Sequence, residues 1–453
     1  MVIPAAFEPF LAEAPLCVMA RLALEGLFDP VRLDALFRNT AQRQYQKELL
    51  FSQVVELMTS VVLCVHPSVL AAYKKRQPLL SVSDQAIYDK LRCMELGISE
   101  ALVADSATQI APVLRALNGR LPPWLPGYRT RVLDGNHLSK TERRLRALRH
   151  TWAAALPGKV LAVYEQELDL VTRVFLTPDG HAQERSLLDD VLPCVQARDL
   201  WIADRNFCTL AFLFGIAAAG AAFVIRQHGQ LQGRLLGRRR SRGRTATGKV
   251  YEQELELEHQ GRTMTVRRVT VVLDQATTDG DTEIHLLTNL SAKAATAAQV
   301  AELYRKRWTI EGRFYEVTQT LNCEPNTLGY PQAALFAFCL ALVASNAVAL
   351  LKAALRAVHE DQAVAQMSSY YMSLEVQETY RGMMIALPPS AWELFRGLPA
   401  EDLAAVLRQV ARRVQPTHYA KAKRGPKKPP PPKGKYQNGG HVSTHKLLQN
   451  RRQ

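Results

Sequence analysis

The sequence predicts a multidomain α/β protein in which a helical N-terminal part precedes a region of strands and helices. Residues 1–125 show several helical periods and no convincing two-residue alternation. After the Pro- and Gly-containing linker at 121–127, the pattern changes to short strands that later alternate with helices. Residues 227–290 add further strand patterns, which predict a mostly-β insertion.

The N-terminal helices are predicted from apolar periods that turn residues interrupt. The periods occur in RLALEGLFDPVRLDALFRNTAQ, LLFSQVVELMTSVVLCV, SVSDQAIYDKLRCMEL and SEALVADSATQIAPVLRAL. Asp29-Pro30, His66-Pro67 and Gly97 are the turn signals.

Two acids follow strands in the next region. The strand patterns are RTRVLDG, GKVLAVYEQ, DLVTRVFLT, LWIADR and AAFVIR, with helices predicted at 184–196 and from Phe207. Asp134 in RVLDGNHL and Asp204 in LWIADRNF each end an apolar run and open a polar turn. The end of a buried strand is where α/β proteins place ligand-binding side chains.

A third acid lies on a stretch predicted to form one helix, Glu302 to Leu321. Its spacing puts Tyr304, Arg307, Trp308 and Glu311 on one side of that helix. Glu311 could simply pair with Arg307 on an amphipathic helix, and Trp308 is expected to pack in the core. Asp134 and Asp204 upstream favour a site instead, because three carboxylates suit Mg²⁺ working on phosphates.

The order Asp134, Asp204, Glu311, with the DGN-H and ADR-F contexts and the Tyr-x2-Arg-x3-Glu helix, resembles a DDE transposase of bacterial insertion sequences. More narrowly, it is similar to the insertion sequence 4 family with its Tyr-Arg-Glu-Lys signature. The likeness extends from the helical N-terminus to the HVSTHKLL tail. Position 318, where the family has its Lys, is Thr here, so we expect weaker phosphate clamping.

The resemblance implies a ribonuclease H-like catalytic core with Asp134 on its first strand and Asp204 on its fourth. It also implies cut-and-paste transposition, in which insertion-sequence ends are bound, cleaved and transferred. Asp134, Asp204 and Glu311 would be catalytic residues and ligands of Mg²⁺, for which Mn²⁺ can substitute. Tyr304 and Arg307 would hold a DNA phosphate.

These patterns divide the chain into six parts. They are an α-helical DNA-binding domain at 1–125, the first part of the catalytic domain at 126–226, a β-rich insertion with a basic loop at 227–290, the second part of the catalytic domain at 291–360, a helical region at 361–415 and a basic Pro/Lys-rich tail at 416–453.

The charge of the chain also favours nucleic acid as partner. The 57 Lys and Arg exceed the 42 acids, which gives a net charge of +15. The stretch at 233–249 is predicted to be a flexible loop that grips phosphates, since it contains no acid. The predicted DNA-binding residues besides Tyr304 and Arg307 are Arg238, Arg239, Arg240, Arg242, Arg244, Lys140, Arg143, Lys427 and Lys428. The last two lie in the tail, which we expect to be an extended arm ordered, if at all, by DNA.

Other function classes find less support in the sequence. No GxxxxGK[ST] loop occurs, which argues against a kinase or nucleotide hydrolase. The seven scattered Cys argue against a zinc site and favour a reducing compartment. No signal peptide is expected at the N-terminus, and the apolar run 333–351 is predicted to be a core helix rather than a membrane span.

We therefore expect a bacterial cytoplasmic, nucleoid-associated protein that acts on double-stranded DNA, both terminal repeats and target. It would be a homodimer or larger on DNA, with no membrane partner. Two rivals stay open: a catalytically impaired DNA-binding relic or inhibitor of transposition, and a structure-selective nuclease without a joining step.

Overall fold

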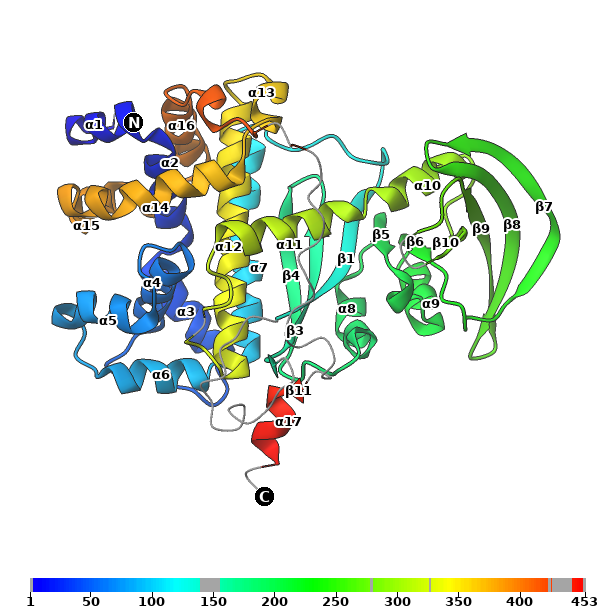
Figure 1. Cartoon of the computed structure of the whole chain (residues 1–453), viewed down its shortest axis with the longest axis horizontal. Coiled ribbons are helices and arrows are strands. Elements are labelled where there is room, and N and C mark those ends of the chain that lie inside the picture. The colour runs from blue at the N-terminus through cyan, green and yellow to red at the C-terminus, as the bar shows by residue number, and fades with distance from the viewer. Residues whose placement is uncertain are drawn as a thin grey trace.

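The computed structural model describes residues 3–138, 155–277, 280–325, 327–422, 425 and 442–450. A body of helices lies on one side, and a large twisted sheet extends away from it to the opposite end of the molecule (Figure 1). This arrangement confirms the predicted α/β class.

The N-terminal part is helical and ends in a long helix against the sheet. Its elements are η1 (Ala5–Phe7), α1 (Glu8–Glu13), α2 (Pro15–Leu27), α3 (Pro30–Thr40), α4 (Phe51–Val62), α5 (Val69–Arg76), η2 (Gln77–Leu79), α6 (Asp84–Arg92) and α7 (Leu96–Ala116). Side-chain caps start several of them: Asp29, Ser68 and Ser83 each accept a backbone N–H in the first turn of their helix. Helix α7 packs on strand β4 and so connects the helical body to the sheet.

Helix α12 (Pro331–Arg356) runs through the middle of the helical body, beside α7 (Figure 1). Within the described residues it is the one helix long and apolar enough to cross a membrane, and 94% of its apolar window is buried. Its apolar side chains contact α2, α4, α7 and α16, as the prediction of a core helix required.

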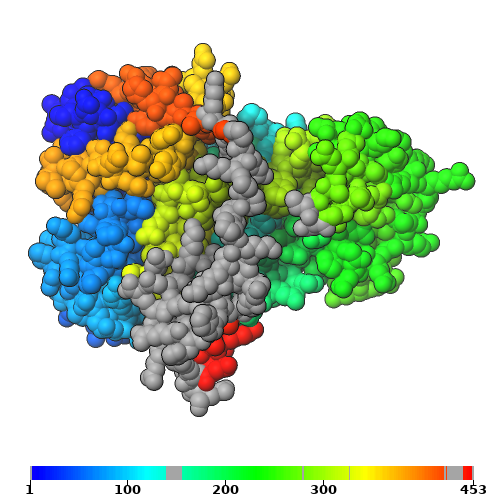
Figure 2. Space-filling model, in the orientation of Figure 1, coloured from blue at the N-terminus to red at the C-terminus, as the bar shows by residue number. Residues whose placement is uncertain are grey.

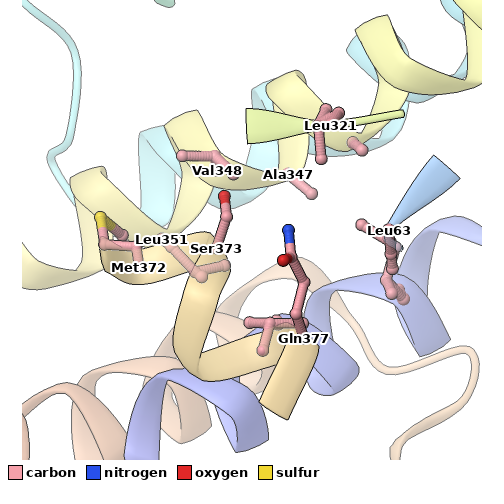
Figure 3. A pocket seen from close by; sticks show the side chains of 12 residues that line it. Leu63, Leu321, Ala347, Val348, Leu351, Met372, Ser373 and Gln377 are labelled. Atoms are coloured by element: carbon pink, nitrogen blue, oxygen red, sulfur yellow. The ribbon is translucent and has the colours of Figure 1, made fainter. Parts of the chain in front are cut away.

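The C-terminal helices fold back onto the first ones. They are α13 (Asp361–Ala365), α14 (Ser369–Ala386), α15 (Pro389–Trp392), η6 (Glu393–Phe395), α16 (Ala400–Ala411) and η7 (Pro416–Tyr419). The ring of Trp392 lies edge-on to Phe7 with centroids 4.8 Å apart, so the two ends of the helical body share one core. A small apolar gap of about 40 Å³ stays between α2, α12 and α14, and Ala347 and Ser373 are among the residues that line it (Figure 3).

The central sheet has nine strands in the order β4-β3-β1-β5-β6-β10-β9-β8-β7. The strands are β1 (Arg129–His137), β3 (Lys159–Glu165), β4 (Leu170–Thr177), β5 (Asp199–Ala203), β6 (Ala222–Arg226), β7 (Arg234–Thr245), β8 (Gly248–His259), β9 (Arg262–Leu273) and β10 (Glu283–Thr288). Strands β1, β5 and β6 are parallel, whereas β3 and β4 are antiparallel additions on one side.

The β-rich segment at 227–290 continues this sheet. Strand β10 pairs antiparallel with β6, and β9, β8 and β7 follow outward. The prediction of a basic loop at 233–249 was wrong, because Arg234–Thr245 form the edge strand β7. Cross-strand pairing with β8 orders the arginines that the sequence suggested were flexible. The β7 edge lies at the far end of the molecule from the helical body (Figure 2).

Short helices cover the face of the sheet that points away from the helical body. They are η3 (Glu184–Leu187), α8 (Leu188–Val191), η4 (Leu192–Cys194), η5 (Arg205–Phe207) and α9 (Leu210–Ala218), so the helix predicted at 184–196 is three short turns. Successive strand residues alternate between the two cores: Val132 and Ile202 face the helical body, whereas Leu133 and Ala203 face α8 and α9.

The C-terminal segment returns to the sheet region. Strand β11 (Val442–Ser443) pairs parallel with β2 (Ala155–Leu156), and α17 (Thr444–Gln449) follows. Lys446 Nζ lies 3.2 Å from Asp179 Oδ2. The end of the tail is thus folded against the protein, and the stretch 423–440 that was predicted to be an extended arm lies, apart from Gly425, outside the described residues.

Candidate active site

Strand alternation places Asp134 and Asp204 on the same face of the sheet. Asp134 lies two residues after Val132 in β1, and Asp204 lies two residues after Ile202 at the end of β5. The two strands are parallel neighbours with Leu133 opposite Ala203, and each acid is the residue that directly follows in the sequence. The face that they share is the one that the helical body covers.

The third acid, Glu311, lies on a helix whose bounds differ from the prediction. The stretch predicted as one helix is two, α10 (Ala297–Arg305) and α11 (Trp308–Thr320). Between them the hydrogen bonds tighten: Arg307 N donates to Tyr304 O at 2.9 Å, and Ile310 N donates to Arg307 O at 3.1 Å. Helix α11 then packs across β1 (Figure 1).

Arg307 joins two of the three acids. Its Nη1 donates to Asp134 Oδ2 at 2.9 Å, and its Nη2 lies 2.8 Å from Glu311 Oε1. Arg307 is only 5% exposed, and its pair with Asp134 is largely shielded from water, whereas the Glu311 side chain is 37% exposed. On the same side, Tyr304 Oη donates to Asp204 Oδ1 at 3.0 Å. The two residues predicted to hold DNA phosphate therefore contact the three acids, and their binding to DNA stays a prediction.

The three carboxyl groups influence each other. Burial raises the pKa of Asp134 to about 7, and the charges of Glu311 and Asp204 add to the increase, while Arg307 opposes it. Burial also raises the pKa of Tyr304, with the Asp204 charge next in importance. The site thus holds more negative charge than one arginine neutralises, which is a condition that a bound cation would relieve.

The donor set fits a hard divalent cation, but the described side chains are not arranged around one. Within the described residues, no group of three or more His, Cys, Asp or Glu could hold a metal ion as placed. Arg307 contacts one oxygen each of Asp134 and Glu311, and Tyr304 contacts one oxygen of Asp204. Carboxylate oxygens are the ligands that Mg²⁺ prefers. Asp134, Asp204 and Glu311 are therefore the residues that would hold such a cation.

Two other residues of α11 were singled out in the sequence, and Trp308 differs from expectation. Trp308 was predicted to be in the core, but it is 61% exposed. The buried face of α11 contains Ile310, Phe314 and Val317, and Trp308 lies off that face. Thr318 donates its hydroxyl at 2.9 Å to the backbone oxygen of Tyr315, in the same helix.

Gly135 has a local steric role beside Asp134. A Cβ at this position would lie 2.3 Å from Glu184 Oε1. The missing side chain of Gly135 therefore leaves room for the Glu184 carboxyl group on the face of the sheet opposite to Asp134. The DGN context gave no sign of this contact, because Glu184 is distant in sequence.

The arginines of β7 are less free than their sequence suggested. Arg239 pairs with Glu283 at 3.2 Å, and Arg242 and Arg244 pair with Glu252 and Asp274, each at 2.6 Å. The expectation that only a polyanion could neutralise this stretch was wrong, because β8 to β10 supply carboxylates.

Two β7 arginines differ from the others. Arg238 and Arg240 are exposed and have no carboxylate partner among the described residues. Arg239 stacks on the ring of Tyr251 at 4.2 Å, so Tyr251 is covered. The other predicted DNA contacts, Lys140, Arg143, Lys427 and Lys428, lie outside the described residues.

Comparison with known proteins finds a family model that matches the middle of the chain. Residues 126–347 match the family model described as "Transposase DDE domain", a domain that generally uses divalent metal ions. No curated protein matches the chain. Among solved structures, the chain is similar to one titled "Cryo-EM structure of piggyBac transposase synaptic complex with hairpin DNA (SNHP)". That likeness has a TM-score of 0.38 and 9% sequence identity, and covers 87% of this chain and 85% of that chain. The matched segment contains Asp134, Asp204 and Glu311, and the match supports a DDE transposase, an enzyme class that cleaves and transesterifies DNA.

Proposed function

We propose that the protein is a cut-and-paste transposase of the insertion sequence 4 type, which binds insertion-sequence ends and catalyses metal-dependent strand cleavage and strand transfer. The observation that carries the proposal is the gathering of Asp134, Asp204 and Glu311 around Arg307 and Tyr304 on one face of the sheet. These acids come from three elements, and the sequence separates them by 70 residues or more.

The strand arrangement supports a ribonuclease H-like core. The strands β4-β3-β1-β5-β6 combine an antiparallel part with a parallel part, and Asp134 lies on the first of them in chain order. Asp204 follows β5, the fourth strand of the large sheet in chain order.

The three acids would hold the divalent cation, Mg²⁺ or Mn²⁺. When bound, such a cation lowers the pKa of attacking water and neutralises charge on the phosphate and the leaving oxygen. Hydrolysis adds water at phosphorus and breaks its bond to the 3′ oxygen, which leaves a 3′ hydroxyl and a 5′ phosphate. In strand transfer, that hydroxyl attacks a phosphate of the target strand and displaces its 3′ oxygen, which takes up a proton.

Arg307 has a distinct role in this proposal. In the free protein it acts as an internal counter-ion that keeps Asp134 and Glu311 together. A guanidinium can donate two parallel hydrogen bonds to a phosphate, so DNA can replace the carboxylates as its partner. Tyr304 can make the corresponding exchange from Asp204 to a phosphate oxygen.

The DNA is proposed to run from this site toward the β7 edge. Arg238 and Arg240 are the β7 cations without a described carboxylate partner, and they suit phosphate contacts. Pairing of two transposon ends would require a dimer or larger assembly on DNA. We propose a cytoplasmic, nucleoid-associated location on the same grounds.

The test is cleavage of a labelled duplex that carries the terminal repeat flanking the gene, in Mg²⁺ and in Mn²⁺. The purified proteins are wild type, Glu311→Gln and the matched control Glu302→Gln, which removes an acid on α10 that pairs with Arg305. We expect wild type and Glu302→Gln to cut and Glu311→Gln to bind without cutting.

The outcomes separate the rivals. If all three proteins bind the end and none cuts it in either metal, the DNA-binding relic is the better account. If wild type cuts but forms no joined product with a target duplex, the structure-selective nuclease replaces the transposase.

A further inference from the structure

Helix α11 carries a second buried arginine two residues after Glu311. Positions 311 and 313 lie about 200° apart around a helix, so the two side chains point to opposite sides. Arg313 is only 7% exposed, and it occupies the buried face together with Ile310, Phe314 and Val317. A charged residue in the middle of an apolar face is rare unless a partner satisfies it.

The partner of Arg313 is Asp169, in the turn between β3 and β4. Arg313 Nη2 donates to the Asp169 carboxylate and, at 3.4 Å, to the Asp169 backbone oxygen. Asp169 adopts the left-handed conformation, with φ of 59°, and its carboxylate also accepts the Tyr164 hydroxyl at 2.7 Å. The turn thus presents the carboxylate and the backbone oxygen of Asp169 to the same guanidinium.

This contact links the two elements that carry Asp134 and Glu311. Tyr164 lies on β3 directly opposite Val132 of β1, and Ala162 lies opposite Asp134 two residues further along. The path from Glu311 through Arg313, Asp169 and Tyr164 therefore returns to the strand beside Asp134. It passes on the side of α11 away from Arg307.

Helix α12 also contacts α11 close to Arg313. Glu316 lies one turn after Arg313, with 3.6 Å between Arg313 Nη1 and Glu316 Oε2. Lys352 Nζ of the core helix α12 donates to Glu316 Oε1 at 3.0 Å. Helix α11 is consequently held by charged contacts to the sheet and to α12 behind the acid that it presents.

We infer that Arg313 and Asp169 form a positioning pair that sets the rotation of α11 and thereby aims Glu311 at Asp134. The inference rests on the proposed function, because it assigns the pair to the metal-binding geometry of that same site. Arg307 cannot do this throughout the reaction, since the proposed function has it exchange Glu311 for a DNA phosphate. The positioning pair keeps its contacts while Arg307 changes partner. A side-chain pattern in the sequence could have indicated it, because Arg313 interrupts an otherwise apolar face.

The test compares Arg313→Lys and Asp169→Asn with wild type. Lysine keeps the charge but loses the planar fork, and asparagine keeps the shape but loses the charge. The matched control is Arg21→Lys, which alters a buried Arg–Glu pair with Glu25 in the helical body, away from α11. Circular dichroism and thermal unfolding select a temperature at which every protein is folded, and Asp169→Asn serves if Arg313→Lys does not fold.

Two readouts follow for each folded protein. Mn²⁺ binding is measured directly from the loss of the free-ion electron paramagnetic resonance signal, and binding of the end duplex is measured by anisotropy in EDTA. We expect both pair variants to bind Mn²⁺ about 10-fold more weakly, as is usual for residues that orient metal ligands, with unchanged DNA affinity. Arg21→Lys should match wild type in both measurements.

The inference is overturned if the folded pair variants bind Mn²⁺ like wild type, or if Arg21→Lys loses as much affinity as they do. If those results accompany normal cleavage by wild type, the proposed function stands and only the positioning role falls. If wild type itself neither binds Mn²⁺ nor cuts DNA, both fall together.

Discussion

Replacement of Asp134 by asparagine should change the pH dependence of stability of the metal-free protein. The stability of the variant relative to wild type should be higher at neutral pH than at acid pH. Burial, with help from Glu311 and Asp204, raises the pKa of Asp134 from 3.8 to about 7 in the folded state. The folded protein therefore keeps a proton that the unfolded chain has already lost. Stability falls as pH rises above 3.8, and the full loss is reached above about pH 7.

The magnitude follows from that interval. Each pH unit between the two pKa values lowers the free energy of unfolding by roughly 1.4 kcal/mol. From pH 5 to pH 8, wild type should lose about 3 kcal/mol of stability through Asp134, whereas Asp134→Asn should not. The attraction between Arg307 and the ionised Asp134 is already included in that pKa, so it adds no further pH dependence.

The assay is urea unfolding in EDTA at pH 5, 6, 7 and 8, followed by tryptophan fluorescence, which can report on the buried Trp201 of β5. The stability of Asp134→Asn minus that of wild type should rise by about 3 kcal/mol between pH 5 and pH 8 and then level off. The control Asp402→Asn, an exposed acid of α16, should follow wild type. A difference that stays constant with pH would show that Asp134 titrates normally, and the electrostatic account of the site would be wrong.

Three further predictions concern other parts of the molecule. Trp308→Ala should change the free energy of unfolding by less than about 1 kcal/mol, because the side chain is exposed, and a drop of several kcal/mol in urea unfolding would contradict this. The double variant Arg238→Ala, Arg240→Ala should bind DNA more weakly and lower the slope of log affinity against log salt by about 2. The control Arg234→Ala, which loses a pair with Glu256, should leave that slope unchanged. Equal slopes for the double variant and wild type in anisotropy titrations would exclude phosphate contacts. Ser373→Val should fill part of the gap in Figure 3 and stabilise the protein by up to about 1 kcal/mol, and a lower melting temperature would mean that the gap cannot accept two methyl groups.

The sequence by itself determined the α/β class and indicated three acids that the structure brings close together. Both depend on short-range patterns: Asp134 and Asp204 each follow an apolar run by a fixed number of residues. Alternation along a strand then dictates that the two acids share a face once their strands are parallel neighbours. The Tyr304, Arg307 and Glu311 spacing likewise predicted that these side chains would act together.

Only the tertiary structure decided what those side chains contact. Arg307 is close to Asp134 across 173 positions of sequence, and Arg313 is close to Asp169 across 144. Helical periodicity could not say which face of α11 is covered, so Trp308 was misplaced. The arginine-rich stretch became an edge strand because β8 pairs with it and carries acids. Local patterns fix where a side chain points along its own element, whereas burial and charge pairing depend on which other elements pack against it.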